Sequence, residues 1–149
     1  MKNKLPYVKE YRDLLVYKKA IELTEEIFVE SKTFPPEEKY SLTDQVRRSS
    51  RSIGAQIAES WGKRLYVKHF VSKLTDAIAE LYETEHWLDI AYNCKYIKLE
   101  TRDELSEKCK EIGRLLGGMI SKADLFCEKT EKHVREGLQE YFSRSHDNN

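Results

Sequence analysis

Apolar residues recur at helical spacing in four long segments, and this periodicity constrains the fold more than any other feature of the sequence. In one segment the apolar positions are Leu42, Val46, Ile53 and Ile57, which fall on one side of a helical wheel. The other three segments carry the stripes Leu14, Tyr17, Ala20, Ile21, Thr24, Ile27 and Phe28; Phe70, Leu74, Ala77, Leu81, Leu88 and Tyr92; and Leu105, Cys109, Ile112, Leu116, Met119, Ile120, Ala123 and Phe126. Four such helices with short connections predict an all-α, antiparallel up-down-up-down four-helix bundle.

Helix-capping signals suggest where these helices begin and end. Asp13, Ser41 and Thr101 are the expected N-caps, and the last two have an acidic residue three positions later, as in a capping box. The segment Phe34-Pro35-Pro36 should end the first helix. We therefore expect helices over residues 13–33, 41–61 and 66–93 and from 101 onward. The chain as a whole divides into an N-terminal extension (1–12), the bundle (13–130) and a polar tail (131–149).

The predicted helix from residue 101 onward and the polar tail after it each have one further feature. Gly113, Gly117 and Gly118 interrupt the stripe. A glycine inside a helix costs about 0.5 to 1 kcal/mol relative to alanine, so we expect another helix to pack close to the backbone here. The tail has apolar residues at helical spacing and is a candidate extension of the last helix before a disordered end from Ser143 to Asn149; these residues are Val134, Leu138, Tyr141 and Phe142.

Composition sets limits on the class of protein. The 149 residues suit one domain, and 35% charged residues with few Gly and Pro are typical of a helical protein. Cys94, Cys109 and Cys127 are odd in number and lack a CxxC pattern, so neither a disulfide framework nor a zinc site is indicated. No apolar run resembles a signal peptide or a membrane span. We expect a cytoplasmic protein that does not contact a membrane.

The second predicted helix carries more polar residues than one helix needs. Beside its apolar stripe runs a polar one made of Gln45, Arg48, Ser49, Ser52, Gln56 and Glu59. Burying such side chains is costly unless each finds a partner, so the stripe is either exposed or part of a polar network inside the protein or between subunits. Arg48 is a candidate ion-pair partner for Glu59 or for Glu80 on the third helix. Small residues in the stripe would let another helix approach closely.

Charge is divided between neighbouring helices although the chain as a whole is neutral. Residues 41–68 hold six Lys or Arg against two acids, a local charge of +4, whereas 69–100 hold three Lys against six acids, a local charge of −3. Complementarity between adjacent helices is one explanation, and a solvated surface is another. A nucleic-acid-binding face is the third. Its candidate phosphate contacts, with Trp61 and Tyr66 nearby for base stacking, are Arg47, Arg51, Lys63, Arg64 and Lys68.

Catalytic chemistry finds little support in the sequence. A di-iron carboxylate site in a bundle needs two Glu-x-x-His motifs, and this chain has one, Glu83 to His86. His86 also lies nearly opposite the apolar stripe of its helix and is expected at the surface. No nucleophile elbow or phosphate-binding loop is present. We expect no catalytic residues, no metal, no cofactor and no enzymatic activity.

A set of short motifs in fixed order resembles a known family. They are Phe34-Pro35, Glu38, Tyr40-Ser41-Leu42, Gln45 to Ser49, Ser52-Ile53, Ile57-Ala58-Glu59, Glu80-Leu81 and Ile112 to Leu116. This combination, over residues 11–126, resembles the four-helix-bundle proteins encoded by intervening sequences in bacterial 23S rRNA genes. The sequence differs from the family pattern at Gln56, usually Asn, and at Ser60, usually Gly. Gly117-Gly118 also resembles the related accessory proteins of diversity-generating retroelements.

The resemblance implies a ring-like homopentamer of four-helix protomers with no known catalytic activity. The retroelement proteins bind nucleic acid and partner a reverse transcriptase, so RNA or DNA and a reverse transcriptase or another nucleoprotein are the partners it suggests, besides the chain itself. We therefore carry two hypotheses. One is a non-enzymatic, oligomeric accessory protein that binds RNA. The alternative is a protein-only scaffold or adaptor whose arginines make ion pairs between subunits.

Overall fold

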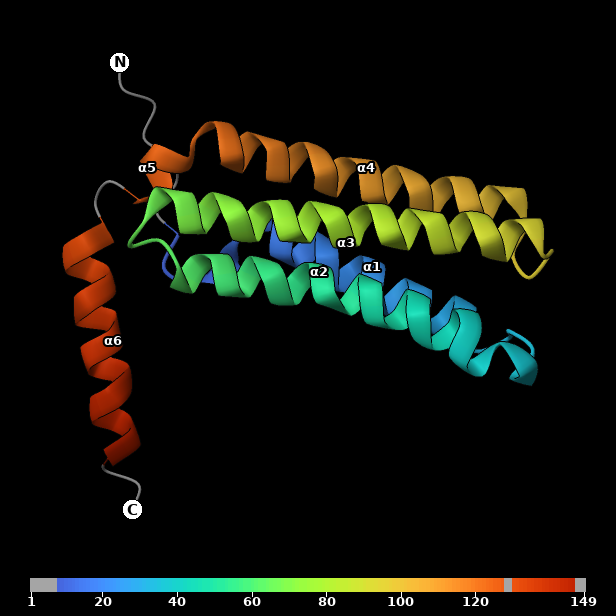
Figure 1. Cartoon of the computed structure of the whole chain (residues 1–149), viewed down its shortest axis with the longest axis horizontal. Coiled ribbons are helices and arrows are strands. Elements are labelled where there is room, and N and C mark those ends of the chain that lie inside the picture. Colours follow the sequence, from blue (N-terminus) through green and yellow to red (C-terminus); the bar gives the residue numbers. More distant parts are fainter. Residues whose placement is uncertain (1–7, 128–129, 147–149) are drawn as a thin grey trace.

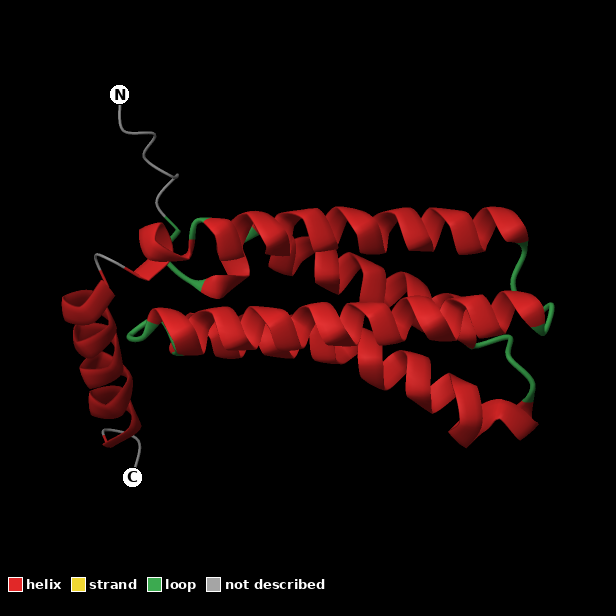
Figure 2. Ribbon diagram, turned by 45° about the horizontal axis from the view of Figure 1, so that its top comes forward, coloured by secondary structure: helices red, strands yellow, loops and turns green. Residues whose placement is uncertain are grey.

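Four long helices lie side by side and form a bundle (Figure 1). The computed structural model describes residues 8–127 and 130–146, and within them all regular structure is helical, as predicted. The long helices are α1 (Leu15–Ser31), α2 (Asp44–Gly62), α3 (Val67–Asn93) and α4 (Leu99–Ser121). In the order α1, α2, α3, α4 and back to α1, each helix contacts the next, so the four enclose one core. Short loops join α2 to α3 and α3 to α4 (Figure 2).

The core consists of the apolar stripes of all four helices. Every predicted core residue of α2 is buried, and so are Phe70, Leu74, Ala77, Leu81 and Leu88 of α3. In α4 the buried residues again follow the predicted stripe, and Ile120 and Phe126 pack against them. Periodicity alone therefore identified three of the four core faces.

The predicted core face of α1 is rotated from the observed one. The buried residues are Val16, Ala20, Leu23 and Ile27, whereas Phe28 is exposed. Tyr17 and Ile21 lie instead at the flank of α1 and approach Gly54 of α2. The prediction was right for Leu14, Ala20 and Ile27, which are buried, and wrong for Phe28, because α1 has two overlapping apolar stripes and the second one flanks the core.

All three predicted N-caps are also wrong. Asp13 belongs to the short 3₁₀ turn η1 (Tyr11–Asp13), and its carboxylate accepts a hydrogen bond from the Glu10 amide. Ser41 lies inside a π-helical turn, η3 (Lys39–Thr43), which follows the 3₁₀ turn η2 (Pro36–Glu38). Because η3 runs directly into α2, upstream carbonyls satisfy the first amides of α2, and the Asp44 amide bonds to the Lys39 carbonyl. No side-chain cap is needed there.

Backbone hydrogen bonds close the end of α3, and the capping box predicted for the start of α4 is not formed. Lys95 has a φ of 63°, the left-handed conformation. Its amide bonds to the Tyr92 carbonyl, and the Tyr96 amide bonds to the Ala91 carbonyl. This pair of bonds is a Schellman motif, which ends a helix compactly. Helix α4 then begins at Leu99, so Thr101 to Glu104 lie within its first turns and form no cap box there.

The C-terminal part departs from the bundle direction. Helix α4 ends at Ser121, and a short helix α5 (Ala123–Cys127) and a longer one, α6 (Thr130–His146), follow. Helix α6 runs across the end of the bundle where α2 meets α3, so it does not prolong α4 (Figure 1). Ser143, the predicted start of a disordered end, is helical, and residues 147–149 lie outside the described part. Among the described helices, none is long and apolar enough to cross a membrane.

Candidate functional site

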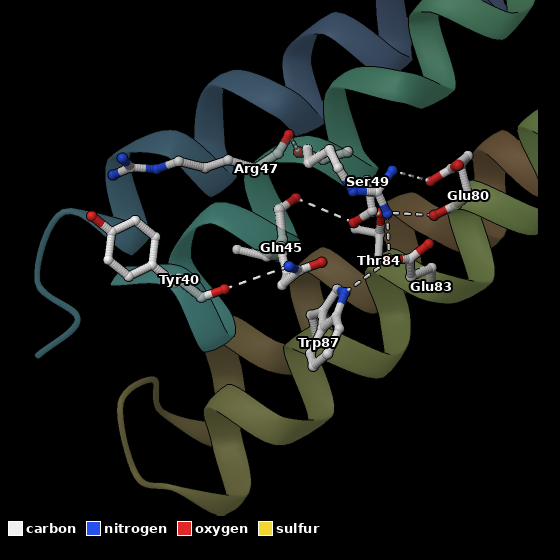
Figure 3. A network of polar contacts seen from close by, with 11 residues as sticks. Tyr40, Gln45, Arg47, Ser49, Glu80, Glu83, Thr84 and Trp87 are labelled. Carbon is white, nitrogen blue, oxygen red and sulfur yellow. Dashed lines mark hydrogen bonds and ion pairs between the residues drawn. The ribbon is translucent and has the colours of Figure 1, made fainter. Parts of the chain in front are cut away.

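Arg48 of α2 forms ion pairs with two carboxylates of α3, those of Glu80 and Glu83 (Figure 3). Its Nη2 donates a hydrogen bond to Glu83 Oε1 at 2.5 Å, and its Nη1 lies 3.5 Å from Glu80 Oε2. The Arg48 hydrogen bond lowers the pKa of Glu83, and Glu83 in turn raises the pKa of Arg48. Trp87 Nε1 donates a second hydrogen bond to the same Glu83 oxygen. The charge of Arg48 is thus balanced within the chain.

Beneath this ion pair lies a buried hydroxyl contact between α2 and α3. The Thr84 hydroxyl lies 2.9 Å from both Ser49 Oγ and the Glu80 carbonyl, and its single proton serves one acceptor at a time. Ser49 donates to the Val46 carbonyl at 3.3 Å. Glu80 Oε2 is buried and forms no hydrogen bond with a described residue, so its contact with Arg48 is an ion pair alone. The small hydroxyl residues therefore let α2 and α3 approach closely.

The rest of the predicted polar stripe also lies along α3 or at the helix start. Glu59 pairs with Lys73 of α3 at 2.9 Å, so its partner is Lys73 and not Arg48. Lys73 Nζ also donates to Gln56 Oε1 at 3.5 Å. Gln45 donates to the Tyr40 carbonyl (Figure 3), and Ser52 is half-buried. Four residues of the stripe thus form a polar seam between α2 and α3 inside one chain: Arg48, Ser49, Gln56 and Glu59.

The opposite side of α2 carries a cluster that we call the α1–α2 basic face: Lys32, Arg47 and Arg51 around the ring of Phe28. The Lys32 ammonium and the Arg47 guanidinium each lie 4.8 Å from the ring centroid, and Arg51 lies 5.8 Å away. Arg47 Nε also donates to Ser31 Oγ at 2.8 Å. In the described part of the chain, no carboxylate forms an ion pair with any of these three cations.

The remaining predicted phosphate contacts gather at the turn between α2 and α3. Lys63 and Lys68 are exposed there beside the exposed ring of Tyr66, which packs edge-on against His69. The Arg64 guanidinium stacks on Trp61 at 3.5 Å from the ring centroid, and its Nε donates to the Trp61 carbonyl. We call Lys63, Arg64 and Lys68 the turn cluster.

The five predicted phosphate contacts therefore form two groups. Arg51 and Lys63 are twelve positions apart, which corresponds to about 18 Å along a helix. Sequence reasoning missed Lys32 and Phe28, because Phe28 was assigned to the core. A usable signal existed: Val16, Ala20, Leu23 and Ile27 already complete a core stripe, which leaves Phe28 outside it with Lys32 one turn later.

Groups with catalytic or metal-binding potential are dispersed in the described residues. His86 is exposed and contacts the ring of Trp87. Burial raises the pKa of Cys109 to about 12, so this thiol is protonated at neutral pH and is a poor nucleophile. No group of three or more His, Cys, Asp or Glu in the described part could hold a metal ion.

Comparison with known proteins places the bundle in a family. The sequence pattern of the 23S rRNA-intervening sequence proteins matches residues 12–118. A crystal structure of a protein of unknown function from the S23 ribosomal protein family of Bacteroides thetaiotaomicron is similar, with a TM-score of 0.64 and 30% sequence identity. The similarity covers 72% of this chain and 96% of that one. A comparison with curated proteins gives no match. The chain is thus a member of the 23S rRNA-intervening sequence protein family.

Proposed function

We propose that this protein is a non-enzymatic accessory protein that binds RNA through the α1–α2 basic face, assisted by the turn cluster. One observation carries the proposal: adjacent arginines of α2 have opposite electrostatic surroundings. Arg48 is neutralised by Glu80 and Glu83. Arg47 and Arg51 instead share one aromatic ring with Lys32, and in the described residues no carboxylate pairs with them.

Three cations held around one ring repel one another, and this repulsion is only partly offset by the ring and by the single carboxylate of Glu25, which lines the surface beside Lys32 and Arg51. A cation–π contact at an exposed site contributes about 0.5 to 1 kcal/mol. A bound anion would relieve the repulsion directly, and a phosphate has the oxygen geometry that arginine forks bind well. A polyanion such as RNA would contact both basic groups along its backbone, which suits their separation along α2.

The binding test compares two pairs of charge-removing substitutions. K32Q/R51Q removes two exposed cations of the basic face and spares Arg47, whose bond to Ser31 ties α2 to α1. K110Q/R114Q removes the same charge from α4 and is the matched control. We expect the first pair to weaken binding of a fluorescent RNA hairpin at low salt on the order of tenfold, and the control to have little effect. Absence of RNA binding by the unaltered protein at low salt would exclude the proposal.

Self-association is a second part of the proposal. Exposed apolar side chains on several helices support it, among them Leu15 (56% exposed), Tyr82 (66%) and Leu125 (53%). A homopentamer would repeat the basic face five times and raise the avidity for a long RNA. Sedimentation equilibrium should then give a mass near five times the 17.6 kDa of one chain, and a monomeric mass at micromolar concentration would contradict it.

The scaffold hypothesis cannot use Arg48, its main candidate residue, because Arg48 belongs to the seam. It requires arginines that pair between subunits, and Arg48 already pairs within its own chain. Its remaining candidates are Arg47 and Arg51, the residues that the RNA proposal also uses. R51Q therefore distinguishes the two hypotheses. If the unaltered protein binds no RNA and R51Q disrupts its assembly, the scaffold hypothesis is favoured. If R51Q lowers the affinity for RNA while the assembly stays intact, the RNA-binding hypothesis is favoured. A reverse transcriptase remains a candidate partner of the RNA-bound form.

A further inference from the structure

A shallow groove lies beside the α1–α2 basic face. Its volume is about 420 Å³, and it is lined by Thr24, Glu25, Phe28, Val29, Lys32 and Arg51. Phe28 and Val29 give it an apolar floor, 37% and 60% exposed respectively.

We propose that this groove holds a single unpaired nucleotide of RNA, with guanine as the preferred base. The inference rests on the proposed RNA binding and adds the kind of RNA that the face selects. The base lies against Phe28 and Val29, and Lys32 and Arg51 contact the adjoining phosphates. Glu25 accepts hydrogen bonds from the edge of the base.

The floor and the cations determine the ligand class. An exposed aromatic ring is a stacking platform for any unstacked base, and flanking cations follow the backbone. A base within a duplex is already stacked and paired, so it cannot reach the ring without leaving the helix. The groove therefore favours single-stranded loops, bulges or ends over double-stranded RNA.

Glu25 supplies the selection among bases. No ion pair involving Glu25 occurs in the described residues, so its carboxylate is available to a ligand. An ionised carboxylate only accepts hydrogen bonds, through two oxygens side by side. Guanine offers two adjacent donors on its Watson–Crick edge, N1–H and the N2 amino group, whereas uracil offers one N–H between two carbonyl oxygens. The same carboxylate would repel an acidic peptide at the rim of the groove.

The test measures a ratio of affinities. The probes are two fluorescent eight-nucleotide RNAs, one of uridines only and one with a central guanosine, and each is titrated with the full-length protein. We expect the guanosine probe to bind more tightly on the order of tenfold, because a bidentate contact to a base gives discrimination of this size. E25Q should reduce the ratio to about one, because the glutamine amide presents one acceptor and one donor. E22Q, one turn earlier on α1 and paired with Lys19, is the matched control and should keep the ratio.

A second variant examines the floor. F28L retains an apolar side chain but removes both the stacking surface and the ring that holds Lys32, Arg47 and Arg51, so it should weaken both single-stranded probes by more than it weakens a blunt RNA duplex. RNA binding with equal affinity for both probes, unaffected by E25Q and F28L, would overturn the groove assignment and leave the RNA function intact. No binding of any RNA would overturn both. Binding of an acidic amphipathic peptide that F28L abolishes, in place of RNA, would identify a peptide site and overturn the nucleotide assignment.

Discussion

Two adjacent arginines show how much a single position decides in this molecule. Successive residues of a helix point about 100° apart, so Arg47 faces α1 while Arg48 faces α3. The sequence placed Arg48 in the polar stripe of the second helix and Arg47 among the candidate phosphate contacts. It could not predict their partners, because Phe28 and Glu83 belong to other helices whose rotation the sequence does not specify. Because the rotation of α1 could not be predicted, Lys32 was also missed as a member of the basic face.

The Arg48–Glu83 pair should make stability depend on pH in the acid range. The pKa of Glu83 is lowered by Arg48, so its contribution to folding is present above its ordinary value of 4.5 and is lost as the pH falls through the lower folded value. Both side chains are partly exposed, so we expect a loss below about 1 kcal/mol. Urea unfolding at pH 7 and at an acid pH below the folded pKa of Glu83 should show E83Q less stable than the unaltered protein at pH 7 and equally stable in acid.

A control for this pH dependence is E107Q, which removes the exposed partner of Arg114. It should change stability at either pH only slightly, since exposed pairs contribute little. A stability difference for E83Q that is the same at both pH values would mean that the carboxylate acts by packing and not by charge.

Lys95 is a position where the chain tolerates strain. Its φ of 63° suits glycine, whereas a side chain there costs roughly 1 to 2 kcal/mol. We expect K95G to raise the free energy of unfolding by about 0.5 to 1 kcal/mol after the greater flexibility of unfolded glycine is deducted. K95A keeps the side-chain clash and should give no gain. Chemical denaturation of the three proteins would decide, and equal gains from both substitutions would exclude the conformational explanation.

At the scale of elements, the seam between α2 and α3 explains why α2 is so polar. Ser49 and Ser60 are fully buried, and the Ser60 hydroxyl donates to the Ile57 carbonyl of its own helix. Small hydroxyl side chains thus satisfy their own polar groups and leave room for α3.

Periodicity identified the helices because burial imposes it along each one. The N-caps failed because Asp13, Ser41 and Thr101 lie within turns or helices whose amides already have backbone partners.

The glycines of α4 offer a test of what covers this helix. A Cβ at Gly113 would lie 3.4 Å from Leu81, but at Gly117 and Gly118 it would meet nothing within 4 Å in the described chain. G117A/G118A should therefore stabilise an isolated chain by about 1 to 2 kcal/mol in all, from helix propensity. If another subunit packs against this face, the same change should disrupt assembly. Thermal unfolding combined with sedimentation distinguishes the two results, and a destabilised monomer would contradict both.

At the scale of the whole molecule, the bundle separates two kinds of charge. The seam neutralises Arg48 with acids of α3, and the α1–α2 basic face remains positive on the other side of α2. The division of charge between adjacent segments was visible in the sequence, but the sequence could not say which cations the neighbouring acids would balance. The family could be predicted from ordered motifs, since these same residues build the seam and the core. The groove could not, because it depends on how α1 and α2 are rotated against each other.

The salt dependence of RNA binding measures whether the α1–α2 basic face contacts phosphates. If the α1–α2 basic face contacts phosphates, a plot of log affinity against log salt for single-stranded RNA should be steep. Removing two contacts in K32Q/R51Q should reduce its slope by about 1.4, because each phosphate contact contributes about 0.7. The K110Q/R114Q control should retain the full slope. A slope that K32Q/R51Q leaves unchanged would contradict the account, since the face would then make no contact with the RNA backbone.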